Sequence, residues 1–296
     1  MIGKKFRLIP LLLLALLIVA SPVSAQEKSH LIWKGSIGQS TVYMMGSIHF
    51  GLPSMYPLPE RIMSAFESSD ALLVEVDIAS VDQNKTMALV SSAGMYQDGT
   101  TLQDHLPSAQ FQRLESAVTQ LGLPVQMMLP QKPWLAVLTL SAISVELQGF
   151  SEQLGVDRYF LDRVSKQQVI EIESLEQQLA LLSGFSDQEQ QWMLTQTLAE
   201  LDDGGVALRA MVLNWKSGDE SAFNQLTAEE FPEGEESDRI YKAIFTDRNR
   251  AMADFVTKLA STKPGTYFVV VGAGHLIGTD GVPALLKKRG YSVNRY

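Results

Sequence analysis

The most constraining feature of the sequence is a pair of short apolar runs, one near each end of the chain, that stop at the same motif. The runs are Thr41–Met45 and Tyr267–Val271, and each is followed directly by Gly-x-x-His, at Gly46–His49 and Gly272–His275. Runs of β-branched, aromatic and other apolar residues that stop at a glycine are typical of buried strands. The pattern therefore predicts two buried strands, each ending at a histidine.

The position of these histidines predicts one composite site. Open α/β sheets bind their ligands at the carboxyl ends of strands, and each histidine lies at such an end. The chain has only four histidines, and two of them, His49 and His275, occupy these equivalent positions. We expect the sheet to bring the two residues together although the sequence separates them.

A similar order of elements surrounds the two motifs. A hairpin is predicted over Leu31–Met45, and after the first motif come a Gly- and Pro-rich loop, a helix and a strand over Asp70–Asp77. After the second motif come a Gly-rich loop, a short helix that ends at Gly290, and the strand-like residues 291–293. This order suggests an internal repeat with one strand, one Gly-x-x-His motif, one helix and one further strand in each unit.

Between the two units, the chain is mostly helical in pattern. Pro133–Leu147 is a strongly apolar helix, a long helix is predicted over Asp238–Leu259, and Val169–Glu173 is the one strand-like run. The predicted fold class is therefore α/β, with a core sheet built from two related N- and C-terminal halves and a large helical insertion at about 100–262.

Residues 1–25 are predicted to be a secretory signal peptide. Residues 1–7 carry three basic side chains, Leu8–Ala20 is apolar, and Val23–Ala25 is a small-residue cleavage site. An uncleaved membrane anchor is the weaker alternative, because a spanning helix needs roughly 20 apolar residues. Cleavage would leave 26–296 as a single domain, secreted or periplasmic, without a stable membrane anchor.

Composition narrows the classes of partner. The chain contains no cysteine, so after export it would depend on its core rather than on disulfides. The formal net charge is −9, and loss of the three positive charges in residues 1–25 would make it −12. An acidic surface argues against nucleic acid or anionic lipid as a partner. A peptide or small-molecule substrate of unknown identity is the remaining expectation.

His49, His275 and Glu75 are the candidate ligands of a divalent metal ion. Neutral imidazole is the commonest side-chain donor to such ions, and Glu75 lies near the end of the strand that follows the first motif. Two imidazoles and one carboxylate leave coordination positions open for water and substrate. The alternative is that each histidine is an ordinary hydrogen-bonding turn residue.

Other polar residues have a functional and a structural interpretation. Asp157 opens a predicted helix, where an Asp is expected from the helix dipole alone. Glu173 could face the site or simply begin the next helix, and Asp77 could be a second carboxylate or a solvated loop residue. From spacing alone, Arg248 and Asn249 belong to a solvated helix face, although Arg248 could stabilise anionic charge.

Several segments together resemble the TraB/GumN family. The resemblance is carried, in family order, by the hairpin with Trp33 and by Val42–His49, Leu72–Asp77, Gly155–Asp157, Val169–Leu182, Asp247–Asn249 and Val270–His275. It covers nearly all of the chain beyond residue 25. Ser47 stands where the family often has Thr, and Glu171 where Gly is common. The family is related to the Tiki metalloproteases and, more distantly, to erythromycin esterases and a haem-binding lipoprotein.

The resemblance implies an α/β core of two related halves with a shared site at His49, Glu75 and His275. The resemblance also favours a functional role over a structural one for Glu173 and Arg248, and to a lesser extent for Asp157. The relatives do not share one chemistry, so the substrate does not transfer.

Two hypotheses of function follow. The first is a secreted metal-dependent hydrolase, in particular a peptidase, in which the metal ion activates water and polarises the scissile carbonyl. Glu75 would be a ligand or the general base, and Arg248 would stabilise developing negative charge. The alternative is a non-catalytic protein that binds haem or a peptide in the same cleft, since two imidazoles could ligate haem iron.

Overall fold

The protein has one mixed six-stranded sheet with helices packed around it, in the order β4-β3-β5-β2-β1-β6. The computed structural model describes residues 30–296, so the predicted signal peptide lies outside the described residues. The strands are β1 (Ile32–Ile37), β2 (Ser40–Ser47), β3 (Ala71–Val74), β4 (Gln168–Glu171), β5 (Thr266–Gly272) and β6 (Ser292–Arg295).

The two predicted strands before the histidine motifs are β2 and β5, and they are parallel neighbours at the centre of the sheet. Ser47 at the end of β2 pairs with Gly272 at the end of β5, so both motifs leave the sheet at the same edge. β3 and β4 run parallel to β5 on one side, while β1 and β6 extend the sheet antiparallel on the other. The predicted α/β class and the predicted hairpin are confirmed.

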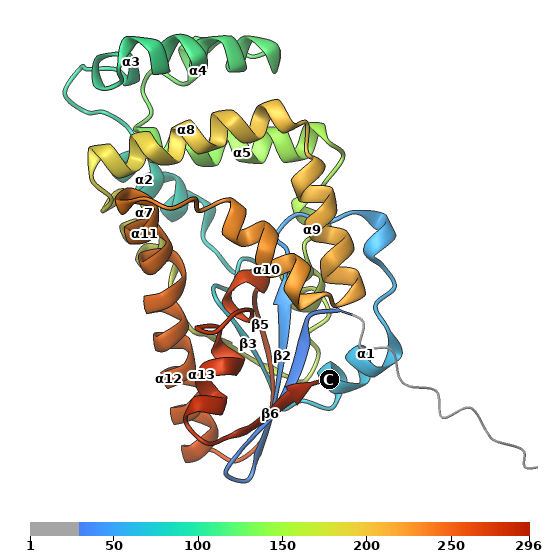
Figure 1. Cartoon of the computed structure of the whole chain (residues 1–296). Helices are drawn as coiled ribbons and strands as arrows, with labels where there is room; N and C mark the ends of the chain where they lie inside the picture. The colour runs from blue at the N-terminus through green and yellow to red at the C-terminus, as the bar shows by residue number, and fades with distance from the viewer. Residues whose placement is uncertain (1–29) are drawn as a thin grey trace, which may run out of the picture.

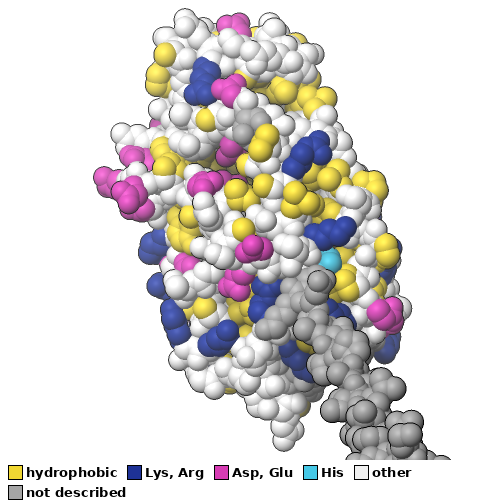
Figure 2. Space-filling view, turned by 45° about the vertical axis from the view of Figure 1, so that its right-hand side comes forward, with side chains coloured by type: hydrophobic (Ala, Val, Ile, Leu, Met, Phe, Trp, Pro, Cys, Tyr) yellow, Lys and Arg dark blue, Asp and Glu magenta, His cyan; other side chains and the backbone are white. Residues whose placement is uncertain are grey.

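Helices supply most of the remaining structure. Their bounds are α1 (Glu60–Glu67), α2 (Gln83–Gly94), α3 (Leu102–His105), α4 (Ser108–Gln120), α5 (Pro133–Leu147), α6 (Val156–Leu161), α7 (Leu175–Ser183), α8 (Asp187–Asp203), α9 (Val206–Ser217), α10 (Glu220–Glu229), α11 (Glu235–Tyr241), α12 (Asp247–Thr262) and α13 (Val282–Lys288). In Figure 1, α5 and α8 lie above the carboxyl edge of the sheet, and α9 and α10 lie between this pair and the sheet. None of the helices in the part of the chain that the structure describes is long and apolar enough to cross a membrane. Figure 2 shows acidic and basic side chains interspersed with hydrophobic ones on one face of the molecule.

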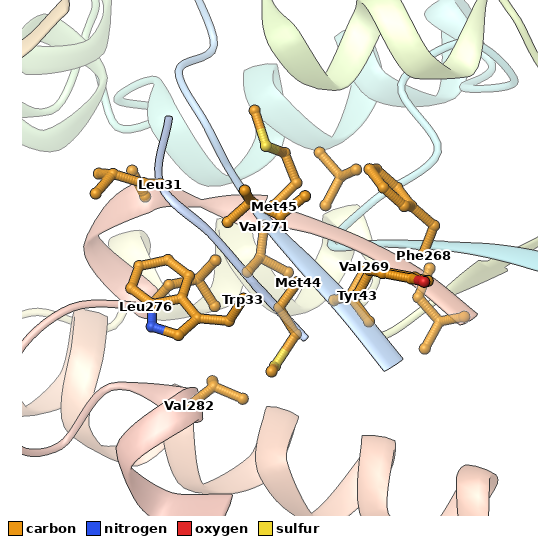
Figure 3. Packing of buried hydrophobic residues seen from close by; sticks show 14 of the residues in the cluster. Leu31, Trp33, Tyr43, Met44, Met45, Phe268, Val269, Val271, Leu276 and Val282 are labelled. Carbon is orange, nitrogen blue, oxygen red and sulfur yellow. The ribbon is translucent and has the colours of Figure 1, made fainter. Parts of the chain in front are cut away.

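The main hydrophobic core surrounds β2 and β5. Side chains of a strand alternate between the two faces of the sheet, and both faces are covered here. Nearly all side chains of β2 and β5 are therefore buried. Figure 3 shows Trp33 and Met44 packing toward Val282 at the start of α13. Phe268 neighbours the register partner of Met44 in β5 and packs against Phe66 and Phe160 instead. A separate apolar cluster lies among α3, α4, α5 and α8. We call the sheet with the core around it the sheet layer, and the cluster of α3, α4, α5 and α8 the helical layer. The sheet layer carries both histidine motifs.

The helical segment between β3 and β5 differs from its predicted form in one detail. The long helix predicted over Asp238–Leu259 is built from α11, a π-helical turn at Lys242–Thr246, and α12. A π turn inserts an extra residue into the helix and is frequent at functional sites. Here it ends at Thr246, two residues before Arg248, and the carbonyl of Ile244 within the turn accepts a hydrogen bond from Arg248 Nη1.

Candidate functional site

Glu75 lies at the centre of the candidate site, one residue beyond β3. Its side chain is only 11% exposed, and the site consists of the groups that surround its two oxygens. Oε1 accepts a hydrogen bond from the backbone N–H of Gly272 at 2.6 Å. Oε2 accepts hydrogen bonds from Arg248 Nη2 at 2.7 Å and from Gln178 Nε2 at 3.1 Å. A carboxylate from the first half of the chain is thus fixed by donors from the helical segment and from the second motif.

Arg248 is held between two carboxylates rather than on a solvated helix face. Its Nε and Nη2 donate to Glu173, Nη2 also donates to Glu75, and Nη1 donates to the carbonyl of Ile244 in the π turn. Gln178 bridges the same two carboxylates from α7. Because most N–H groups of the guanidinium are already engaged, its observed contacts orient Glu75.

His275 is buried and its ring orientation is fixed by Asn249. The imidazole Nδ1 lies 2.6 Å from Asn249 Oδ1, and Asn249 Nδ2 donates to the carbonyl of Asp280 at 3.0 Å. Because that carbonyl can only accept, Oδ1 of Asn249 must face the imidazole, and the network assigns the ring hydrogen to Nδ1. Nε2 of His275 therefore keeps its lone pair, and it lies 3.8 Å from Glu75 Oε1.

His49 has a similar arrangement in a more open position. Its Nδ1 lies 3.2 Å from Asp157 Oδ1, while the imidazole side chain is 62% exposed and that of Asp157 is 12% exposed. This leaves Nε2 of His49 for a ligand. In both histidines, an oxygen acceptor holds Nδ1, which is the arrangement typical of metal-ligating imidazoles.

The loop that carries His49 fits closely against the segment before α6. The backbone N–H of Val156 donates to the carbonyl of Ile48 at 2.9 Å. A Cβ at Gly155 would lie 2.2 Å from the carbonyl oxygen of His49, so only glycine allows this approach. The Gly155–Asp157 segment therefore positions His49 through both its backbone and the Asp157 carboxylate.

The pKa values of His275, Glu75 and His49 at the site differ from those of the free side chains. Burial lowers the pKa of His275 to about 4, against the opposing effect of Glu75, so His275 is neutral at neutral pH. Burial alone would raise the pKa of Glu75, but the two histidines, the guanidinium and the backbone N–H described above lower it to about 2. The carboxylate of Asp157 raises the pKa of His49 to about 9.

The donor set at His275 and Glu75 fits a divalent cation. At neutral pH, His275 Nε2 and Glu75 Oε1 are two acceptor atoms 3.8 Å apart, and a cation placed between them would relieve the repulsion of their partial negative charges. An ion with bonds of about 2.1 Å to each atom can bridge such a separation. No group of three or more His, Cys, Asp or Glu side chains within residues 30–296 is close enough to hold a metal ion as it stands. His49, the proposed third ligand, would have to move closer.

Not every candidate from the sequence lies at this site. Glu173 and Asp157 do, since they bind Arg248 and His49. Asp77 lies apart, because its backbone N–H binds Glu171 and it lines a separate cavity. His105 stacks on Tyr96 in the helical layer, with ring centroids 4.2 Å apart.

The sequence interpretation missed one residue of the site and misplaced one histidine outside it. Asp280 anchors Asn249 through its backbone carbonyl, and no pattern in the sequence marks that contact. His30 lies where the sequence alone predicts an N-terminal tail, and yet it is buried at 4% exposure with its ring edge on Trp215. The chain is therefore packed into the core from its first described residue.

Comparison with known proteins assigns the chain to a family. The model of the TraB/PrgY/gumN family matches residues 31–295, nearly all of the part that the structure describes. A protein of Escherichia coli (strain K12), named YbaP and described as uncharacterized, is 28% identical over 84% of this chain and 89% of its own length. No solved structure matches the chain.

More distant relatives include proteins named as metalloproteases. Metalloprotease TIKI2 of Danio rerio is 21% identical over 92% of this chain and 62% of its own length. Metalloprotease TIKI1 of Xenopus tropicalis is 23% identical over 85% of this chain and 58% of its own length. The similarity thus extends along most of the chain, whereas each of these relatives has a further part that the chain does not match.

Proposed function

We propose that this chain, which belongs to the TraB/PrgY/gumN family, is an exported metal-dependent hydrolase that cleaves peptides. The observation that supports the proposal most strongly is the pair of acceptors formed by His275 Nε2 and Glu75 Oε1, 3.8 Å apart. The distant similarity to metalloproteases TIKI1 and TIKI2 favours peptides as the substrate class. The first argument supports a cation at the sheet edge, and the second supports peptide hydrolysis as the use made of it.

In this proposal, His275, Glu75 and His49 would hold a divalent ion, whose chemistry would be Lewis acidity toward a carbonyl and activation of water. Glu75 suits a ligand better than a general base, because a pKa of about 2 leaves it little affinity for a proton at neutral pH. Arg248 and Gln178 hold Oε2 so that Oε1 stays directed at His275. Asn249 keeps the imidazole in the tautomer that offers Nε2.

His49 would complete the site from the solvent side. Its proton, which Asp157 stabilises, would have to leave before Nε2 could bind an ion, so binding would release protons below the raised pKa. Once His49 is neutral, Asp157 would accept the Nδ1 hydrogen and orient the ring. The exposed position of His49 also leaves room for a substrate to approach.

Haem binding has less support as an alternative. Axial ligation needs an open approach to the imidazole nitrogen, whereas His275 is 4% exposed and the Glu75 carboxylate lies in front of its Nε2. No contact among the described residues specifically favours haem over a small cation.

Export remains part of the proposal because residues 1–25 have the pattern of a signal peptide. Expression of the full chain with its N-terminus intact, followed by N-terminal sequencing of the mature product, tests this part. A mature N-terminus at Gln26 is expected, and a product that retains Met1 would contradict it.

A peptide library incubated with the purified protein tests the activity. We expect cleavage that a chelator abolishes and that added divalent metal restores. Glu75→Gln and His275→Ala should lose cleavage by at least about a hundredfold, since a metal ligand is lost in each. His105→Ala, a histidine of the helical layer, is the matched control and should retain activity. Full cleavage in the presence of chelator would overturn the proposal.

A further inference from the structure

A second cavity lies in the helical layer, apart from the sheet edge. It has a volume of about 390 Å³ and is lined by residues of α5, α8, α9 and α10. We call it the helical cavity. Its size lies within the range of about 300–1,000 Å³ that is typical of small-molecule sites. None of His49, Glu75, Arg248 or His275 lines it, so it is separate from the proposed metal site.

The floor of the helical cavity is aliphatic. Val145, Leu208 and Met211 line it and also pack against the main hydrophobic core. These side chains are held by the core, so the apolar floor is preformed. A ligand with a hydrocarbon body would therefore remove apolar surface from water without having to order the wall.

The charged residues that line the helical cavity are all acidic. Glu200, Glu229 and Glu230 are among the lining residues, which include no Lys, Arg or His. All three are exposed, so an ion from solution can reach them. Desolvation by the surrounding protein atoms and, to a smaller degree, the charge of the nearby Glu200 raise the pKa of Glu230 to about 7, so a cation beside Glu230 would favour its charged form.

One buried acceptor at the wall has no partner among the residues that the structure describes. Gln148 Nε2 donates to Ser144 Oγ at 3.2 Å, whereas its buried Oε1 has no hydrogen-bond partner. Gln148 closes the cavity near Gly205, where an added Cβ would lie 1.3 Å from Oε1. Because Oε1 is shielded from solvent, Gln148 contributes to the wall by closing it rather than by binding a ligand.

We propose that the helical cavity binds small molecules with an aliphatic body and a protonated amine. The apolar floor would take the hydrocarbon, and the three carboxylates at the rim would pair with the ammonium group. This inference concerns a site separate from the proposed metal site and does not depend on the proposed hydrolase activity.

Three probes that share the same octyl group but differ in charge test the proposal. The purified protein is titrated calorimetrically with octylammonium, octanol and octanoate at neutral pH. Octylammonium should bind most tightly, and octanoate at least about tenfold more weakly, since the rim attracts one sign and repels the other. Equal affinity for octylammonium and octanoate, or no binding of octylammonium, would overturn the proposal.

Variants assign the binding to this cavity. The double substitution Glu229→Gln and Glu230→Gln should weaken octylammonium about fivefold, as expected for exposed ion pairs, and leave octanol unchanged. Ala199→Trp and Ala207→Trp, each from an exposed lining position, should fill the cavity and abolish binding of both probes. Leu213→Trp is the matched control, because Leu213 is 67% exposed on α9 but does not line the cavity. If the folded Trp variants bind octylammonium as the unmodified protein does, the cavity is not the site.

Discussion

The sheet-edge site and the helical layer hold their charged side chains in opposite ways. At the sheet edge, Arg248 and Glu75 are 17% and 11% exposed, and each is bonded to partners from distant parts of the chain. In the helical layer, the ion pair of Arg113 with Asp202 is 46% and 68% exposed. Buried charges require nearly every partner to be present, whereas exposed ones do not. The comparison teaches that the sheet edge is preorganised and that its polar groups act as a unit.

Loss of one buried charge gives the largest expected effect. Arg248→Met removes the guanidinium that Glu75 and Glu173 share and leaves both carboxylates buried, so we expect a loss of about 3–5 kcal/mol in the free energy of unfolding. Arg113→Met, the matched change in the helical layer, should lose no more than about 1 kcal/mol. Urea denaturation measures both. Similar losses in the two variants would show that the two regions do not differ as described.

The prediction from sequence succeeded at the sheet edge where local pattern decides. Apolar runs that stop at glycine place β2 and β5, and their parallel pairing brings both histidine motifs to one edge. The local pattern could not place Arg248 and Asn249, because helical spacing alone made a solvated face the simpler interpretation. Their burial depends on Glu75, which lies 173 residues from Arg248, and on His275.

The same limit explains Asp157 and Asp280. An Asp at the start of a helix is already accounted for by the helix dipole, so nothing local points to its contact with His49, 108 residues away. Asp280 acts through a backbone carbonyl, which every residue possesses. For these contacts, only the fold or the family resemblance could supply the missing information.

One buried amide side chain from each region, Asn249 at the sheet edge and Gln190 in the helical layer, gives the next comparison. Asn249→Leu removes the acceptor that holds His275 Nδ1, so we expect metal affinity to fall about 10- to 100-fold. Gln190→Leu is the control, because Gln190 is also a buried amide but bonds to Phe185 and Trp134 in the helical layer. Competition with a chelating dye measures the affinity. Equal affinity in the Asn249→Leu protein and the unmodified protein would remove Asn249 from the account.

The pH dependence of stability gives a smaller difference. The pKa of His275 is lowered from 6.5 in the unfolded chain to about 4 in the folded protein. Between these values the unfolded state binds more protons, so stability contributed by neutral His275 is lost as the pH falls through this window. Urea denaturation across the window, with a chelator present, measures the loss. His275→Gln should reduce it and His105→Gln should leave it intact, and the opposite result would contradict the assignment.

The metal content of the purified protein tests the central claim most directly. Elemental analysis is made of the unmodified protein and of the His275→Ala, His49→Ala and His105→Ala variants, each folded and exposed to the same divalent ions. The account predicts about one ion per chain in the unmodified protein and in His105→Ala, and a loss of that ion in His275→Ala and His49→Ala. Unchanged metal content in both sheet-edge variants, or no metal in the unmodified protein, would contradict it.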